Sequence, residues 1–357
     1  MKRIGHLMEQ MMTEENFIEA ERRMAKHKPN NKMARYLAAN AEEKGKELLS
    51  RIKNGEFQWS NPKETTIKDS YKGKERHLKI PNLEDQVAQQ AWLIIAEPHL
   101  LRHNYYYCCG SVPGAGQTRA TEALRKWLKN PKMKYGAVLD ITKFYETCPH
   151  SEVEKSLRRI FKDEAFIRFA MGFTATMSDN GIGIAIGYPI SHWLANLVLT
   201  KMDCELKRLY PDIKYVRYMD DMALVCTNKR HLKRAVQFIR ENMFGMGMEL
   251  KKWQWFKITD THPLTFLSYR FFHKRTILTK KLMVRISRRM KKASECMNAH
   301  TAAGVISLMG VLKHCDSFNF KQKYVYPFVN IQVCKRLISC KSKQQAFLRL
   351  QKEMLAT

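Results

Sequence analysis

The spacing of hydrophobic positions at the start of the chain predicts helices. Residues 1–60 are polar and helix-prone, and Leu48, Leu49 and Ile52 recur at the spacing of one helix face among dense Lys and Glu. The turn signal Asn54–Gly55 closes this stretch. We therefore expect an N-terminal helical lead-in.

A strand pattern comes next. Residues 65–81 are β-prone, and Lys72–Gly73–Lys74 divides them as a turn would. Helices are predicted over about 83–97 and about 118–128, with the glycine-rich loop 110–116 between them. This loop fits neither of the common phosphate-binding glycine patterns, so we interpret it first as a connector, with phosphate contact as the alternative.

Two apolar runs in the middle of the chain are followed by carboxylates. Residues 135–140 read YGAVLD, as expected of a buried strand with an acid at its end. Residues 214–226 read KYVRYMDDMALVC, in which two β-prone runs flank a polar turn at 219–221. An apolar helical stripe covers 191–199, and from about Leu282 the chain becomes helical and basic.

Charge narrows the class of partner. The chain carries 63 Lys and Arg against 34 Asp and Glu, a formal net charge of +29. Such an excess favours binding to a polyanion, above all nucleic acid, because basic side chains release counterions from phosphates. A basic membrane-surface protein is the weaker alternative, since the charges are spread along the chain and are not gathered on one amphipathic helix.

The remaining composition argues against a secreted, zinc-bound or membrane-spanning protein. Nine cysteines, an odd number, indicate reduced thiols, and none has the spacing of a zinc site. No apolar run approaches the roughly 20 residues that a membrane span needs, and the N-terminus lacks the apolar region of a signal peptide. We expect a soluble protein without a membrane partner.

The three acids at the ends of these runs fit a two-metal site. Nucleotidyl transfer needs carboxylates from separate segments to converge on two Mg²⁺ ions about 4 Å apart. Asp140 at a strand end and Asp220 with Asp221 on a hairpin supply that arrangement. An isolated Asp–Asp pair is commonly a solvated turn, but two flanking strands would hold both acids at a fixed apex.

A family resemblance begins at these residues. Tyr218–Met219–Asp220–Asp221 resembles the YxDD box of reverse transcriptases, and DITKFY at 140–145 resembles the DxxxxF/Y box. Further boxes follow in the family's order over about Lys74 to Phe272. They are the fingers segment 74–89, the loop 110–116, the palm-helix box GYPISHWLAN at 187–196, residues 247–257, and FLSY at 266–269, close to the FLGY primer grip.

The resemblance implies an RNA-directed DNA polymerase in which Asp140, Asp220 and Asp221 are catalytic and bind two Mg²⁺ ions, with Mn²⁺ as a substitute. The resemblance also places Ile141 among the metal-binding positions. Tyr145 would pack under the sugar, where it would exclude a 2′-hydroxyl and favour dNTP over rNTP.

The same resemblance assigns contacts to substrate and nucleic acid. Lys74 and Arg76 would face the triphosphate, with surface charge as the alternative. Either Lys252 or Lys257 would donate a proton, although a solvated face is an equal alternative. The other dNTP-binding positions are Phe144, which also suits the core, Ile186 and Gly187. The template or primer positions are Ser191, Tyr218, Met219, Lys252, Phe266, Leu267, Arg285, Arg288 and Arg289.

The palm-helix box indicates a branch of the family. Ile186 stands where group II intron enzymes carry Gln in QGxxxSP, so IGxxxS resembles the IGxxxSQ form of diversity-generating retroelement enzymes, which copy a template RNA with errors opposite adenine. His192 replaces the Gln of that form, and 110–116 lacks the usual basic residues. For His192 itself, an ordinary helix histidine is the competing interpretation.

The fold class expected from the resemblance is α/β (α+β), a right-hand polymerase with fingers and palm around an antiparallel sheet and a helical thumb. The expected domains are a lead-in (1–60), fingers (61–135), palm (136–275) and a basic thumb (276–357) that lies against the template–primer duplex. We expect no RNase H or endonuclease domain after the thumb.

The biological setting has three alternatives. The first is a diversity-generating retroelement, with a small basic accessory protein. The second is an antiviral or other bacterial reverse transcriptase with a dedicated structured non-coding RNA. The third is a catalytically silent RNA-binding scaffold, against which the three aspartates argue. The expected partners are template RNA, the RNA/DNA duplex and dNTPs, and the expected location is the cytoplasm of a bacterium or of a phage host; the sequence does not predict an oligomeric state.

Overall fold

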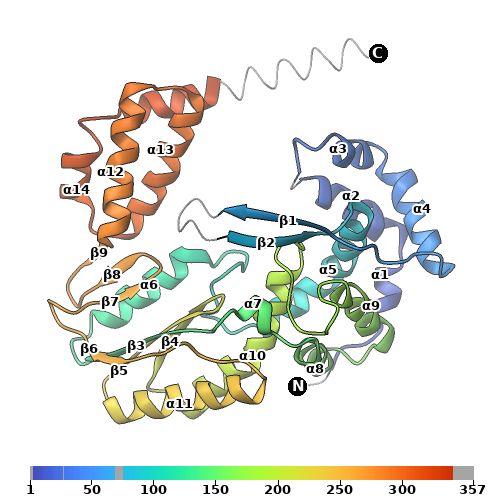
Figure 1. Cartoon of the computed structure of the whole chain (residues 1–357), viewed down its shortest axis with the longest axis horizontal. Helices are drawn as coiled ribbons and strands as arrows, with labels where there is room; N and C mark the ends of the chain where they lie inside the picture. Colours follow the sequence, from blue (N-terminus) through green and yellow to red (C-terminus); the bar gives the residue numbers. More distant parts are fainter. Residues whose placement is uncertain (1–2, 27, 69–74, 341–357) are drawn as a thin grey trace. The chain divides into compact units, whose positions relative to one another are not determined.

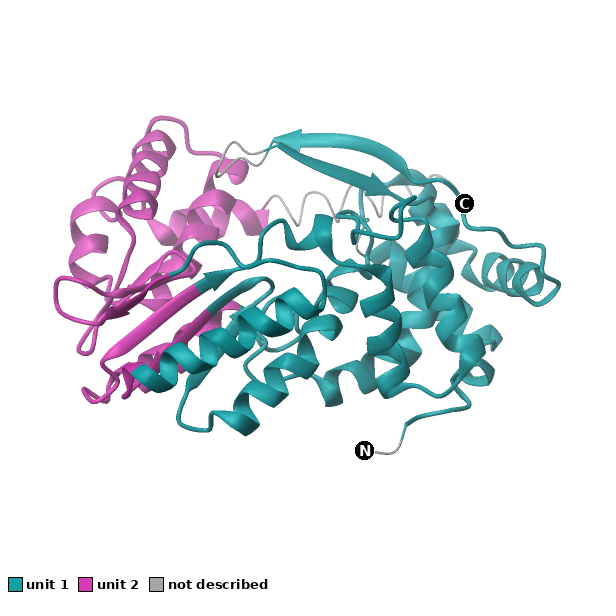
Figure 2. Cartoon of the chain, turned by 60° about the horizontal axis from the view of Figure 1, so that its bottom comes forward, with its two compact units in different colours: residues 1–116, 139–222, 230–253 teal, residues 117–138, 223–229, 254–357 magenta. Residues whose placement is uncertain are grey.

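The computed structural model describes residues 3–26, 28–68 and 75–340 (Figure 1). The chain divides into two compact units, coloured separately in Figure 2. Unit 1 comprises 1–116, 139–222 and 230–253, and unit 2 comprises 117–138, 223–229 and 254–357. Each unit therefore collects segments that are distant in the sequence.

Four helices open unit 1, so the helical lead-in is confirmed. They are α1 (Leu7–Met11), α2 (Glu14–Lys26), α3 (Lys32–Ala39) and α4 (Ala41–Lys53). The Asn31 side chain caps α3 by accepting from the Ala34 amide at 3.0 Å. In α2, Phe17, Ala20 and Met24 lie on one face and are buried where this helix packs against α4 and α5.

A two-stranded hairpin and a long helix follow. Strands β1 (Lys63–Lys68) and β2 (Glu75–Ile80) pair antiparallel, as the sequence pattern predicts. Helix α5 (Leu83–His103) starts at the Asn82 cap. It continues six residues beyond the predicted end at Glu97 and through Pro98. Proline usually ends a helix by removing a donor, but here Leu100 is buried in the extra turns and keeps them packed.

The central sheet has the strand order β4-β5-β3-β6. Its strands are β3 (Tyr135–Asp140), β4 (Lys214–Tyr218), β5 (Asp221–Cys226) and β6 (Trp255–Lys257). The predicted strand 135–140 and hairpin 214–226 are confirmed, and β3 and β6 pair antiparallel. All residues of β5 after the first are buried, which makes this sheet part of the core.

The remaining helices of unit 1 lie between residues 144 and 245. Helix α10 begins at Ser191, as expected, and extends past the predicted stripe to Leu209, with most of its residues buried. The helices are α7 (Phe144–Thr147), α8 (His150–Ile160), α9 (Glu164–Ala175), α10 (Ser191–Leu209) and α11 (Lys229–Gly245). Helix α11 starts at the last residue that unit 2 contributes before returning to unit 1.

Unit 2 contains a three-stranded antiparallel sheet and further helices, among them the predicted basic one. The sheet is formed by β7 (Leu264–Phe266), β8 (Tyr269–Phe271) and β9 (Thr276–Leu278). The helices are α6 (Gly116–Leu128), which begins at the last residue of the preceding unit 1 segment, α12 (Lys280–Glu295), α13 (Ala299–Val311), η1 (Leu312–His314) and α14 (Phe318–Tyr324). The mixed helix and sheet class with antiparallel pairing is thus confirmed.

Two absences apply to the part of the chain that the structure describes. None of its helices combines the length and the apolar character needed to cross a bilayer. All nine cysteines are free thiols, and Cys108 and Cys109 are both buried, in agreement with the prediction of reduced thiols.

Candidate catalytic site

The three candidate carboxylates come from strand ends in unit 1. Asp140 is the last residue of β3, Asp220 lies in the turn after β4, and Asp221 is the first residue of β5. The expected three-residue turn at 219–221 is therefore two residues long, because Asp221 already takes part in the strand. Tyr218, assigned to template or primer, is the last residue of β4 and half-buried.

The turn between β4 and β5 has a strained backbone. Met219 has φ of 58°, in the left-handed region that side chains other than Gly rarely adopt. Gly110, the first residue of the glycine-rich loop, lies against it, and a Cβ at Gly110 would stand 2.4 Å from the Met219 amide nitrogen. The loop is therefore more than a connector, because its first residue must be Gly for this turn to pack.

Behind this turn lies a buried ion pair that sequence reasoning missed. Arg217 of β4 and Asp203 of α10 are both fully buried, and Arg217 Nη2 donates to Asp203 Oδ2 at 2.6 Å. Burial lowers the pKa of Arg217, but the negative charge of Asp203 outweighs it and the net shift is upward. The sequence signal for this pair is weak. It consists of one arginine within a strand whose other central residues are apolar and buried, where a charged side chain needs a partner.

Burial and three charged neighbours determine the pKa of the Asp220 carboxyl group. Burial raises the pKa of Asp220, and the negative charge of Asp140 adds to that shift. The charges of Lys251 and Arg76 oppose it. The structure therefore brings Asp140, Asp220, Lys251 and Arg76 into one electrostatic group.

Lys251 is the lysine that the structure brings to the acids, and sequence reasoning did not choose it. Its Nζ lies 2.6 Å from Asp140 Oδ2, and its amide donates to the Asp140 carbonyl at 2.9 Å. Lys252 is exposed, and Lys257 lies on β6 opposite Tyr135 in unit 2. Consecutive side chains in extended backbone point to opposite sides, so only one of Lys251 and Lys252 can face Asp140. The sequence does not show which of the two does so.

The candidate sugar and metal positions beside Asp140 differ in exposure. Ile141 is fully buried and bridges to Leu250, and Phe144 is 2% exposed, so its ring is part of the core. Tyr145 is half-buried; burial, followed by the negative charge of Asp220, raises the pKa of its hydroxyl. Of these three side chains, Tyr145 is the one outside the core, and it lies close enough to Asp220 to be affected by its charge.

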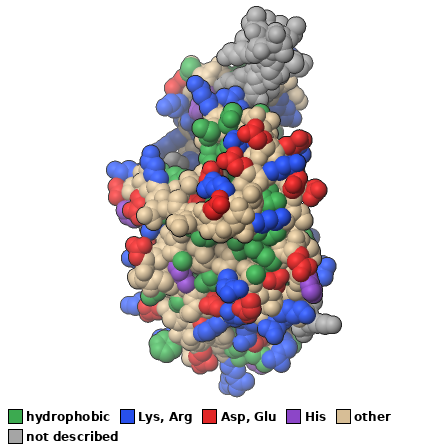
Figure 3. All heavy atoms as spheres, turned by 90° about the vertical axis from the view of Figure 1, so that its right-hand side faces the viewer, with side chains coloured by type: hydrophobic (Ala, Val, Ile, Leu, Met, Phe, Trp, Pro, Cys, Tyr) green, Lys and Arg blue, Asp and Glu red, His purple; other side chains and the backbone are tan. Residues whose placement is uncertain are grey.

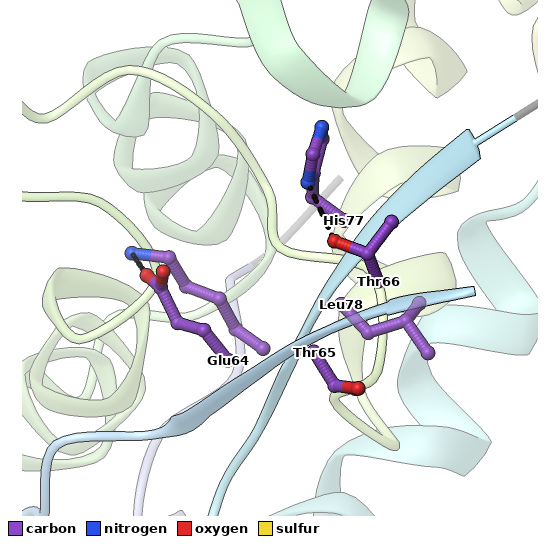
Figure 4. Close-up of a pocket in the computed structure, with 6 residues that line it drawn as sticks. Glu64, Thr65, Thr66, His77 and Leu78 are labelled. Carbon is purple, nitrogen blue, oxygen red and sulfur yellow. Dashed lines mark hydrogen bonds and ion pairs between the residues drawn. The ribbon is translucent and has the colours of Figure 1, made fainter.

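The β1–β2 hairpin carries the candidate triphosphate contacts. Arg76 lies on β2 opposite Ile67, and Lys74 lies outside the described residues. A pocket with a volume of about 240 Å³ lies on this hairpin. Figure 4 shows its lining side chains, with Thr66 hydrogen-bonded to His77. Its lining residues are Glu64, Thr65, Thr66, His77, Leu78 and Lys79. Two of these lining residues, Lys79 and Glu64, form an ion pair with 3.3 Å between Nζ and Oε1.

The palm-helix box approaches this hairpin through its backbone. The Lys79 amide donates to the Ile186 carbonyl at 2.9 Å. Gly187 has φ of 120°, and a Cβ there would stand 2.5 Å from the Lys79 carbonyl oxygen. The buried Ser191 hydroxyl donates to the Ala185 carbonyl. Gly187 is thus required for close approach, and Ser191 braces the turn before α10.

His192 lines a larger pocket in unit 1, of about 630 Å³. Burial lowers the pKa of its imidazole, which favours the neutral ring. The wall includes Gln90, whose buried Oε1 has no hydrogen-bond partner among the described residues. The other polar lining residues are Arg23, Lys28, Gln86, Glu97 and Ser111. His192 therefore lies in the wall of a cavity that polar and apolar side chains line together.

Unit 2 carries the remaining candidate nucleic-acid contacts. Phe266 is 3% exposed, and the turn that follows it places both Leu267 (φ 49°) and Ser268 (φ 70°) in the left-handed region. On α12, Arg285 and Arg288 are exposed. Arg289 is half-buried, and its guanidinium lies beside Gly304 of α13. The buried face of α12 consists of Leu282, Ile286, Met290 and Ala293.

The surface charge is mixed on the face that Figure 3 shows, where Lys and Arg side chains are interspersed with Asp and Glu. The net charge of +29 is therefore not gathered into one uniformly basic area on this face. Along the sequence, Lys and Arg are likewise spread over many segments, with a dense run at 274–292.

The acids suit a divalent cation in their chemistry. Asp140 Oδ1 is buried and has no hydrogen-bond partner among the described residues, and burial, followed by the negative charge of Asp140, raises the pKa of Asp220. Carboxylate oxygens are the ligands that Mg²⁺ prefers. Within the described ranges, no three Asp, Glu, His or Cys side chains are already gathered tightly enough to form a preassembled ion site. The fit of these acids to Mg²⁺ therefore rests on the type of their donor atoms.

Comparison with known proteins gives one family. Residues 62–271 match the family described as "Reverse transcriptase (RNA-dependent DNA polymerase)". No curated protein matches the chain. Similar solved structures include telomerase from Candida albicans with a fragment of telomeric RNA, at 10% identity and a TM-score of 0.48, covering 74% of this chain and 54% of that one.

Another is apo telomerase from Candida tropicalis, at 13% identity and a TM-score of 0.47, covering 80% of this chain and 63% of that one. A C-terminally truncated form from the same organism gives 12% identity and a TM-score of 0.49, covering 64% and 58%. The chain thus spans between about half and two thirds of the length of these telomerase chains.

Proposed function

Because the chain belongs to the reverse transcriptase (RNA-dependent DNA polymerase) family, we propose that it synthesises cDNA on an RNA template by nucleotidyl transfer at Asp140, Asp220 and Asp221. The family match covers more than half of the chain and confirms the expected enzyme class and polymerase fold. The observation that carries the proposal is the electrostatic grouping of Asp140 and Asp220 with Lys251 and Arg76.

Divalent ions are the cofactors of this family, and Mg²⁺, with Mn²⁺ as a substitute, is the cofactor we propose here. Asp140, Asp220 and Asp221 would hold it. When bound, it would stabilise charge on the attacking and leaving oxygens of the displacement. The unpartnered Asp140 Oδ1 and the raised pKa of Asp220 support this assignment.

The chain's own residues orient the dNTP. Arg76 presents a permanent cation on β2, suited to phosphate oxygens. Tyr145, beside Asp220, limits space where a ribose 2′-hydroxyl would lie. Lys251 holds Asp140 through its ammonium and would serve as the proton donor that the sequence led us to seek at Lys252 or Lys257.

The template strand is assigned to the pocket lined by His192. Its neutral imidazole, the unpartnered Oε1 of Gln90 and the cation of Lys28 offer hydrogen bonds to bases and phosphate. The expected duplex contact is the exposed face of α12, with Arg285 and Arg288.

The test is primer extension on an RNA template with dNTPs and Mg²⁺. Asp220→Asn should lower kcat by at least about 10³-fold, because it removes a negative charge on which the reaction depends. Asp260→Asn, at an exposed position, is the matched control and should retain activity. Extension that survives in Asp220→Asn would refute the site, and an inactive parent would favour the RNA-binding scaffold.

Within the family, we propose a diversity-generating retroelement enzyme, on the resemblance of IGxxxS and the apolar Ile186. An isoleucine in place of glutamine removes a polar group from the box that adjoins β2, which would loosen templating geometry. Ile186→Gln should therefore reduce misincorporation opposite template adenine; unchanged error rates would contradict this role.

The alternative is a defence-associated or other bacterial enzyme with a dedicated non-coding RNA. Sequencing RNA that copurifies with the protein distinguishes the two. A template-repeat transcript, with a small basic accessory protein, supports diversification, and a solitary structured RNA supports defence. In either case we propose a cytoplasmic location.

A further inference from the structure

The guanidinium of Arg217 uses every one of its donors although it is fully buried. Nε donates to both oxygens of Asp203, at 3.0 and 2.9 Å, and Nη2 donates to Asp203 Oδ2 at 2.6 Å and to the Asn196 carbonyl at 3.4 Å. Nη1 donates to Asn196 Oδ1 and to the Met219 carbonyl, both at 2.9 Å. All five N–H groups of the side chain therefore have acceptors.

The acceptor that fixes the guanidinium belongs to a rigid element. Asp203 is fully buried on α10, and it also accepts from the Tyr215 hydroxyl at 2.7 Å. Asn196, on the same helix, donates to the Gly110 carbonyl at 2.8 Å. Helix α10 therefore holds Arg217 from one side and the start of the glycine-rich loop from the other.

The remaining donor reaches the catalytic turn. The Met219 carbonyl precedes the Asp220 amide, so its orientation sets the peptide plane from which Asp220 projects. Met219 is held at φ of 58°, a conformation that persists only where the surroundings enforce it. Two contacts hold Met219 in this conformation: the hydrogen bond from Arg217 to its carbonyl and the close packing of Gly110 against its amide nitrogen.

We propose that Arg217 is a positioning residue for catalysis, which transmits the fixed geometry of Asp203 on α10 to the turn that carries Asp220 and Asp221. Arg217 is fully buried, so it does not touch substrate. The inference rests on the proposed function of these aspartates, and it adds a residue on whose contacts their placement depends.

The experiment replaces the pair together. Arg217→Met alone would leave the buried Asp203 carboxylate without a counter-ion, with only the Tyr215 hydroxyl still donating to it, and so destabilise the protein for an unrelated reason. Arg217→Met/Asp203→Leu removes both charges, keeps apolar volume and deletes the bond to Met219. The matched control is Arg158→Met/Glu164→Leu, which removes an ion pair between α8 and α9.

The double variant should melt as one cooperative unit and bind the template–primer duplex with a Kd within about twofold of the parent. Its KM for dNTP should also stay within about twofold, while kcat falls on the order of 10²-fold, because displacement of reacting groups by about 1 Å has that effect. Mn²⁺ binding, followed by electron paramagnetic resonance, should weaken in parallel with kcat. The control variant should match the parent in all four measurements.

Two results would overturn the positioning role. The first is a folded double variant with the parent's kcat and Mn²⁺ affinity. The second is a loss of kcat matched by an equal loss of template–primer binding, which would make the pair merely structural. A parent that extends no primer contradicts the proposed function instead, whereas an active parent with an equally active double variant contradicts only this inference.

Discussion

At the scale of single residues, the choice between neighbouring lysines is the clearest example of what side-chain direction decides. Lys251 places its ammonium 2.6 Å from Asp140 Oδ2, while Lys252 is exposed. An ammonium beside a catalytic carboxylate balances charge and can supply a proton to a leaving group. We therefore propose Lys251, in place of Lys252 or Lys257, as the proton donor.

Lys251→Met should lower kcat on the order of 10²-fold, the usual contribution of a positioned proton donor, with little change in KM for dNTP. Lys252→Met, one residue away, should change kcat by less than about twofold. Single-turnover extension at saturating dNTP measures both. Equal losses in the two variants would contradict the assignment of Lys251.

At the scale of elements, the packing of α2 against α4 and α5 buries a carboxyl group. Glu21 is 2% exposed, and its Oε2 has no hydrogen-bond partner among the described residues. Burial raises its pKa to about 7; the negative charge of Glu84 adds to the shift and Lys44 opposes it. Helix α2 is therefore most compatible with a protonated Glu21.

This burial predicts a pH-dependent stability. The folded carboxyl keeps its proton up to about pH 7, while the unfolded one loses it near pH 4.5. The folded state thus binds more protons between these values, so the free energy of unfolding should fall as pH rises from about 4.5 to 7, by up to about 3 kcal/mol, and stay level above.

Glu21→Gln, which stays neutral, should remove this dependence and raise the free energy of unfolding above pH 7 by about 2–3 kcal/mol, with little change at pH 4. Urea unfolding followed by circular dichroism across this range measures the effect. Glu19→Gln, exposed on the same helix, is the control. Parallel curves for the parent and Glu21→Gln would show that burial does not shift this carboxyl.

At the scale of the whole molecule, the net charge of +29 predicts binding dominated by phosphate contacts. The Kd for a template–primer duplex should rise steeply with salt. Replacing Arg285, Arg288 and Arg289 of α12 by Gln should lower the slope of log Kd against log salt by up to about 3, since each phosphate contact contributes about 0.9.

The matched set is Arg168, Arg208 and Arg234, replaced by Gln on α9, α10 and α11. It removes the same charge from three other helices and should leave most of the slope in place. Binding measured by fluorescence anisotropy over a range of KCl concentrations gives both slopes. An equal reduction by the two sets would show that α12 has no special part in holding the duplex.

Local patterns were enough to predict most elements and the three acids. Strand periodicity ends at Asp140 and resumes around Asp220 and Asp221, and these signals depend only on nearby residues. The hairpin, the helical lead-in and the basic helix were predicted for the same reason. The end of α5 was not, because tertiary burial of Leu100 overrides the local effect of Pro98.

The sequence by itself determined the residue types to which we assign the chemistry: three carboxylates in an ordered set of boxes, on a strongly basic chain. Only the tertiary structure decided what surrounds them. Arg217 meets Asp203 from 14 positions away, Gly110 meets Met219 across more than 100, and Lys251 meets Asp140 across 111. Such contacts arise when distant elements pack together, and the local periodicity of a sequence does not encode them.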